Sequence, residues 1–110
     1  MQIVFTEEAL VGLVVAHFRK RLSLNLIEVA PDIGLMASTL QRIEAGKSSL
    51  SVTQLRKLCT RLEVPIFGIF SLGETFRRQL TERGVTIVED VPDDFTGVVL
   101  TLKQAQDIVS

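Results

Sequence analysis

Apolar residues recur at intervals of three and four along most of the chain, which is the spacing of one helix face. The longest such stripe runs through Leu10, Leu13, Val14, Phe18 and Leu22. Val11 and Val15 widen this stripe around the helix. We therefore predict a mainly α fold whose first helix is apolar on more than one face, which suits contact with a partner subunit as well as with the core.

Capping residues and glycines divide this pattern into five short predicted helices. Thr6 suits the N-cap of the first helix, and Asn25 with Glu28 has the spacing of a capping box at the start of the second. The further predicted starts and stops are Gly34, Gly46, Ser51 and Pro65. We assign the five helices to one domain over residues 6–72.

The remaining segment, residues 73–110, has a different pattern. A helix is predicted around residues 76–80, and two β-branched runs at 85–88 and 98–102 flank a loop. This arrangement predicts a small β-hairpin. Since a lone hairpin is marginally stable in water, we expect it to lean on the helical core, on residues 1–5 or on a second copy. Unpaired edge strands invite a partner, so we assign this extension to dimerisation.

The charge of the chain is unevenly distributed. The net charge is −1, but residues 1–72 hold eight basic and six acidic residues, whereas residues 73–110 hold four basic and seven acidic residues. A basic N-terminal part of the chain can form a local nucleic-acid-binding surface even when the overall charge is negative. Charge alone does not decide between partners.

Several classes of chemistry are not favoured by the residues present. Cys59 is the single cysteine and His17 the single histidine, whereas a zinc site needs about four ligands. We expect no catalytic site, no metal and no cofactor, and we expect Cys59 to be a buried thiol in a reducing cytoplasm. No apolar run approaches the roughly 18 residues that span a bilayer. We expect a soluble, cytoplasmic protein without enzymatic activity.

Four segments agree in register with one known family. They are Asn-Leu-Ile-Glu-Val-Ala (25–30), Ser-Thr-Leu-Gln-Arg-Ile-Glu-Ala-Gly-Lys (38–47), Ser-Val-Thr-Gln-Leu-Arg-Lys-Leu (51–58) and Leu-Glu-Val-Pro (62–65). Together with Gly34 they resemble the helix-turn-helix domain of Cro and phage-repressor proteins, the Xre-type family, over roughly residues 10–70. The resemblance implies a five-helix repressor-like domain that binds operator DNA as a dimer and places its third helix in the major groove. The tail, with its Gly-Val-Val-Leu at 97–100, is similar to that of short Xre-type regulators that end in a hairpin.

The resemblance also implies which residues meet the bases. Ala37, Ser38, Gln41 and Arg42 occupy the positions from which the family reaches base edges. A guanidinium such as that of Arg42 can bind guanine O6 and N7 in bidentate fashion, and Gln41 can bind adenine likewise. Ala37 can meet a thymine methyl. The alternative for these residues is an ordinary solvated helix face.

Phosphate contacts are implied around this helix. Asn25 begins the second helix, where the family sets a backbone amide or side chain against phosphate, and Ser38 and Thr39 can also reach it. Lys47, Ser48 and Ser49 match the loop that grips the backbone on the far side. Lys20 and Arg21 are either a solvated helix end or further phosphate contacts.

One implied pairing is structural. Arg19 and Glu44 match the family's arginine in helix one and the glutamate that it meets, so we predict a partly buried ion pair. Three positions depart from the family pattern: Leu26 replaces a phosphate-clamping Gln, Pro31 should kink or shorten the second helix, and Met36 replaces a polar cap. These departures weaken the inferred DNA grip.

Two functional hypotheses follow. The first is a homodimeric, sequence-specific DNA-binding regulator, by default a repressor, that acts on double-stranded DNA at a palindromic operator and is nucleoid-associated when bound. The alternative is a protein-interaction module or antitoxin-like protein that keeps the fold with weak or no DNA binding, with a toxin or an effector as its partner.

Overall fold

A computed structural model describes residues 1–109 of the chain, and the predicted mainly helical fold class is confirmed within them. The elements follow in the order β1 (Ile3–Thr6), α1 (Glu7–Arg21), α2 (Leu26–Val29), the 3-10 helix η1 (Ala30–Ile33), α3 (Ala37–Glu44), α4 (Val52–Arg61), α5 (Ile66–Glu82), β2 (Val85–Val88), β3 (Val98–Val99) and α6 (Leu102–Val109).

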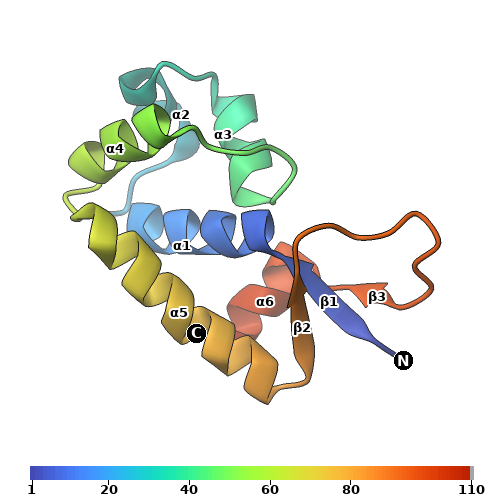
Figure 1. Cartoon of the computed structure of the whole chain (residues 1–110). Helices are drawn as coiled ribbons and strands as arrows, with labels where there is room; N and C mark the ends of the chain where they lie inside the picture. Colours follow the sequence, from blue (N-terminus) through green and yellow to red (C-terminus); the bar gives the residue numbers. More distant parts are fainter. Residues whose placement is uncertain (110) are drawn as a thin grey trace.

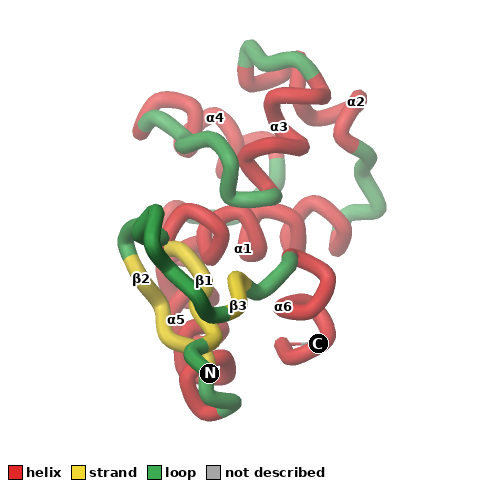
Figure 2. Tube along the Cα trace, turned by 90° about the vertical axis from the view of Figure 1, so that its right-hand side faces the viewer, coloured by secondary structure: helices red, strands yellow, loops and turns green. Residues whose placement is uncertain are grey.

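Helix α1 runs through the middle of the molecule. The helices α2, α3 and α4 lie on one side of it, and α6 with the strands lies on the other, as Figures 1 and 2 show from two directions. Its side chains are buried nearly all round, Val15 and Ala16 completely. Packing on two sides within one chain therefore accounts for most of the wide apolar stripe of α1, while Val11 stays half-buried.

The predicted caps and glycine turns are confirmed. The Thr6 hydroxyl accepts a hydrogen bond from the Ala9 amide at 3.1 Å, and complete capping boxes begin α2 and α4. Gly34 and Gly46 end their helices with φ of 74° and 76°, left-handed values that glycine adopts without steric cost. These boundaries arise from local hydrogen bonds, which is why the sequence predicts them.

Pro31 shortens the second helix, as predicted. The α-helix stops at Val29, and the chain continues as the 3-10 helix η1, with Pro31 in its first turn. Proline has no amide hydrogen to donate to the preceding turn, so the tighter helix continues where the α-helix cannot. The turn still buries Val29, Ala30 and Ile33 in the core.

Helix α1 lies against the end of α3 at close range. A Cβ atom built on Gly12 of α1 would lie 2.5 Å from the backbone oxygen of Glu44, and closer still to that of Ile43. One built on Gly46 would lie 2.5 Å from the Cβ of Ala9. The two backbones can come this close only because neither glycine has a side chain.

We predicted a fifth short helix and then a separate helix around residues 76–80, and this division is wrong. Residues 66–82 form the single helix α5, which passes through Gly68 and Gly73 without a break. Glycine lowers helix propensity by about 1 kcal/mol, but the packing of Ile69, Phe76 and Leu80 into the core outweighs that cost. The boundary predicted between residues 72 and 73 thus lies inside a helix rather than in a linker.

The predicted hairpin is also wrong. The strands β2 and β3 do not pair with each other; each pairs in parallel with the N-terminal strand β1, in the order β2-β1-β3. Val4 and Phe5 of β1 are buried at the centre of this sheet. The loop over residues 89–97 carries the chain back across the sheet, so that β3 runs in the same direction as β2. Local sequence pattern shows that a segment is extended, but it does not show which segment becomes its neighbour.

The second extended run ends earlier than predicted. Only Val98 and Val99 form β3, and Thr101 instead caps α6. The Thr101 hydroxyl accepts from the Gln104 amide at 3.1 Å, and the Gln104 side chain accepts from the Thr101 amide at 2.9 Å. This is a Thr-x-x-Gln capping box, a signal present in the sequence that the β-branched pattern around it masked.

An ion pair joins the first and fifth helices. Both terminal nitrogens of Arg77 on α5 donate to the Glu7 carboxylate on α1, at 2.8 and 2.6 Å. This hydrogen bonding lowers the pKa of Glu7 below its ordinary value, against the opposing effect of burial. The pair fastens the C-terminal half of α5 to the start of α1, beside the sheet.

We expect Gly12→Ala to lower the free energy of unfolding by about 1–3 kcal/mol, because the added methyl must push α3 away from α1. Urea unfolding followed by circular dichroism measures this. The matched control is Gly73→Ala, where the new methyl has its nearest contact at 3.8 Å and alanine favours the helix by about 0.5–1 kcal/mol. Equal destabilisation by both substitutions would contradict the close-crossing argument.

Candidate nucleic-acid interface

Helix α3 presents a polar outer face to solvent. Leu40 and Ile43 are buried in the core, while Ser38, Gln41 and Arg42 on the other side are exposed. Figures 1 and 2 show α3 across α1 from the sheet and from α6. A helix with polar side chains on its free face can enter a major groove about 12 Å wide and present hydrogen-bonding groups to the bases.

The start of α3 has no side-chain cap. Met36 occupies the N-cap position, where its side chain makes no capping hydrogen bond, as predicted. Ala37 and Thr39 in the first turn are half-buried, so they offer less surface than Ser38. The amides of this turn therefore have no side-chain acceptor, and the N-terminus of a helix favours anions.

Arg42 folds back toward the loop that follows α3. Its Nε donates to the Ser48 hydroxyl at 3.3 Å, and its Nη2 donates to the Lys47 carbonyl at 3.2 Å. These contacts are long and exposed, so water or a base edge can replace them at little cost. They bring Arg42, Lys47 and Ser48 together at the C-terminal end of the α3 face.

Ser49 lies in a different environment. Its hydroxyl donates to the Glu8 carboxylate at the start of α1, at 2.7 Å. The sequence reading missed Glu8 here, because the two residues are far apart in the chain and no local signal links them. A carboxylate at this point repels phosphate and already uses the Ser49 hydroxyl, so Lys47 and Ser48 are better placed than Ser49 for a backbone contact.

Asn25 is engaged at the start of α2. Its side-chain oxygen accepts from the Glu28 amide at 2.8 Å, and its own amide donates to the Glu28 carboxylate at 3.2 Å. Both groups that could cap the helix are thus in use, and the side-chain amino group of Asn25 remains for a phosphate oxygen. The neighbouring Glu28 carboxylate is exposed and lowers the positive potential at this corner.

The ion pair between Arg19 and Glu44 fixes the end of α3. Arg19 Nε and Nη2 donate to the two carboxylate oxygens at 2.7 and 2.8 Å, and Nη1 donates to the Leu24 carbonyl at 2.7 Å. The two residues are 8% and 4% exposed. Hydrogen bonding to Glu44 raises the pKa of Arg19, against the opposing effect of burial. One guanidinium therefore joins α1, the turn after it and the end of α3.

The helix-turn-helix segment also exposes apolar side chains. Leu26, in the position of the family's phosphate-clamping Gln, packs against the core, whereas Ile27 and Met36 are 74% and 73% exposed. The sequence reading did not single out Ile27. The sequence does contain a signal for its exposure, because Leu26 and Val29 already fill the inward face of this four-residue helix and leave Ile27 on the outer face.

The potential metal ligands and the single thiol are dispersed in the described part of the chain. Within residues 1–109 there is no group of three or more His, Cys, Asp or Glu side chains that could hold a metal ion. Cys59 is buried, and burial raises the pKa of its thiol, which disfavours the reactive thiolate. No helix in this part of the chain has the length and apolar character needed to cross a membrane.

Comparison with known protein families identifies the helical domain in the N-terminal part of the chain. A family model described as helix-turn-helix matches residues 15–69, half of the chain. The chain belongs to this family, the Xre-type helix-turn-helix proteins, which are DNA-binding regulators. The match runs from the middle of α1 into α5 and includes α3. No curated protein matches the chain.

We expect Arg19→Met or Glu44→Gln to lower the free energy of unfolding by about 3–5 kcal/mol, because each strands a buried partner. Thermal and urea unfolding measure this. The double variant Arg19→Met/Glu44→Leu should recover most of the loss, because no charge is then left unpaired. The control is Arg61→Gln, which breaks an ion pair to Asp32 whose side chains are 32% and 50% exposed. That change should cost less than about 1 kcal/mol, and an equal cost at both pairs would refute the special role of Arg19 and Glu44.

Proposed function

We propose that this helix-turn-helix protein is a sequence-specific transcriptional regulator that represses by binding a palindromic operator as a homodimer. The observation that carries the proposal is the open, polar outer face of α3, with Ser38, Gln41 and Arg42 exposed on a domain of a DNA-binding family. Such a protein acts in the cytoplasm, on the nucleoid when it is bound to DNA.

The base contacts are assigned to the middle and end of the α3 face. Gln41 and Arg42 are neighbours there, and each suits a bidentate pair with adenine or guanine that discriminates by about 1–3 kcal/mol. Arg42 would exchange its hydrogen bonds to Ser48 and to the Lys47 carbonyl, each worth about 0.5–1.5 kcal/mol net, for base acceptors. Ala37 at the start of the face suits a thymine methyl.

The phosphate contacts are few. Lys47 and Ser48 lie beside Arg42, and the Asn25 amino group with Ser38 and Thr39 supplies the remaining candidates. Glu8 at Ser49 and Glu28 at Asn25 oppose phosphate at two of these places. This arrangement supports a modest affinity in which sequence readout by Gln41 and Arg42 matters more than charge.

A protein-interaction role is the second candidate. Ile27 on α2 and Met36 at the N-cap of α3 are 74% and 73% exposed, which is more typical of a protein-binding surface than of a phosphate-binding one. In this case a toxin or an effector protein would cover the same face, and DNA binding would be weak or absent.

The dimer contact is assigned to the N-terminal half of α5. Phe67 and Phe70, three residues apart on this helix, are 72% and 57% exposed. Phe70 also lines a groove of about 200 Å³ together with Val11 and Ile69. Since β2 and β3 already pair with β1, the C-terminal extension offers only short strand edges, whereas the two phenyl rings and this groove offer an apolar surface to a second copy.

We expect the protein to select a palindromic sequence from a random duplex library and to bind it in gel-shift assays with salt-dependent affinity. Arg42→Ala should reduce the binding free energy by about 1–3 kcal/mol and relax specificity at one position in each half-site. Lys47→Ala should weaken binding to all sequences alike, and it should reduce the slope of log affinity against log salt concentration by about 1. Arg78→Ala on α5 is the control and should leave binding unchanged. If no sequence is enriched and no retention occurs at low salt, the protein-interaction role replaces this proposal.

We expect the protein to dimerise in sedimentation-equilibrium experiments and the double variant Phe67→Ser/Phe70→Ser to weaken the dimer at least about thirtyfold, since central aromatic contacts contribute about 2 kcal/mol or more. The control is Val99→Lys on the exposed strand β3, which should leave the dimer intact. If Val99→Lys dissociates the dimer and the Phe variant does not, the interface lies at the sheet edge in the C-terminal extension.

A further inference from the structure

A pocket lies on the far side of α1 from α3. It has a volume of about 530 Å³ and is formed where α1, α5 and α6 meet. This volume falls within the roughly 300–1,000 Å³ of small-molecule sites. It shares no residue with the base contacts or the dimer contact proposed above, and of the candidate phosphate contacts only Lys20 and Arg21 line it.

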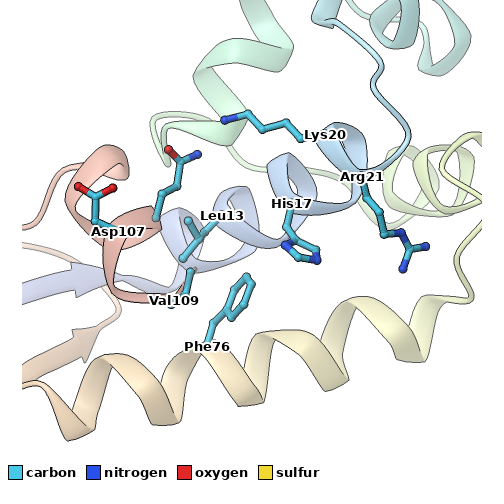
Figure 3. Close-up of a pocket in the computed structure, with 8 residues that line it drawn as sticks. Leu13, His17, Lys20, Arg21, Phe76, Asp107 and Val109 are labelled. Carbon is cyan, nitrogen blue, oxygen red and sulfur yellow. The ribbon is translucent and has the colours of Figure 1, made fainter.

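The walls of the pocket are apolar and partly aromatic. Leu13 from α1, Phe76 from α5 and Val109 from α6 provide one wall, and the His17 ring points toward Phe76 (Figure 3). The centroids of these two rings are 5.6 Å apart in an edge-to-face arrangement. A flat aromatic body fits against such walls better than a branched or polar one.

The rim of the pocket is positively charged at one end. Lys20 and Arg21 extend in opposite directions from the last turn of α1 (Figure 3). Among residues 1–109, Asp107 of α6 is the one carboxylate that lines the pocket, and its Oδ1 lies 3.7 Å from Lys103 Nζ. In the described part of the chain, no carboxylate is paired with Arg21.

Arg21 is already held in place for an anion. Its guanidinium lies over the Phe18 ring, with 4.9 Å between the guanidinium carbon and the ring centroid. A stacked guanidinium contacts the ring with its flat face. Its N–H groups lie in the guanidinium plane, so they remain free to bind a carboxylate in bidentate fashion. The stacking also removes part of the entropy cost of ordering this long side chain.

His17 adds a neutral polar group beside Arg21. Partial desolvation lowers the pKa of His17, and the nearby charge of Arg21 lowers it further, so the neutral form of the imidazole is favoured. A neutral imidazole keeps one ring N–H that can donate to a carboxylate oxygen. The pocket thus combines an apolar body, one fixed cation and one neutral donor.

We propose that this pocket binds an aromatic monocarboxylate, with the carboxylate on Arg21 and His17 and the ring system against Phe76, Leu13 and Val109. Such a molecule would contact α1 on the face opposite to α3 and would bridge α1 to α5 and α6. The site is therefore suited to a small-molecule effector of the protein.

The test uses naphthalene-2-carboxylate as the probe and proton NMR as the readout. Since the chain has a single histidine, the imidazole Cε1 proton signal reports on this pocket alone. We expect a saturable shift of that signal on titration at neutral pH. The uncharged naphthalene-2-carboxamide should bind about tenfold more weakly, because it loses the charge-assisted hydrogen bonds.

Two neighbouring substitutions separate the proposed contact from general charge attraction. Arg21→Gln should weaken binding of naphthalene-2-carboxylate about tenfold, whereas Lys20→Gln, an equal loss of charge one residue away, should weaken it less than about threefold. Both side chains are exposed, and circular dichroism checks that each variant stays folded. No saturable shift, equal binding of acid and amide, or equal effects of the two substitutions would overturn the proposal. DNA is absent from the experiment, so its failure leaves the proposed function untouched.

Discussion

The arrangement of the whole molecule depends on how closely α1 can approach the end of α3. The missing side chain of Gly12 lets the α3 carbonyls of Ile43 and Glu44 lie directly against the α1 backbone. Gly46 repeats this contact against Ala9 one turn away. An eight-residue helix is too short to be stable in water by itself, so α3 exists because α1 holds it.

The same crossing determines which face of α3 is free. Leu40 and Ile43 are turned toward the core, and the bidentate contact from Arg19 to Glu44 fixes the rotation of the helix about its own axis. Gln41 and Arg42 must then point outward. The polar face that we assign to DNA is therefore a consequence of apolar and ionic contacts made on the opposite side of the helix, and the buried ion pair contributes orientation more than net stability.

Helix α1 also connects this face to the rest of the chain. One side carries α3, and the other forms the wall of the pocket lined by His17 and Arg21. The Glu7–Arg77 pair at its start and the Arg19–Glu44 pair near its end hold it to α5 and to α3. A molecule bound in the pocket would thus contact the element on which α3 rests, without touching the face proposed to meet DNA.

The sequence by itself determined the local structure: the caps at Thr6, Asn25 and Ser51, the glycine stops, the shortening at Pro31 and, through the family resemblance, the position of α3. These features depend on hydrogen bonds and backbone preferences within a few residues, so the sequence pattern contains them. Tertiary structure decided the rest. It placed β1 between β2 and β3, joined α5 through Gly73, turned Arg42 back onto Ser48, engaged Ser49 with Glu8 and assembled the pocket. Each of these depends on which distant segments become neighbours, and that is settled by the burial of the whole core rather than by any local run of residues.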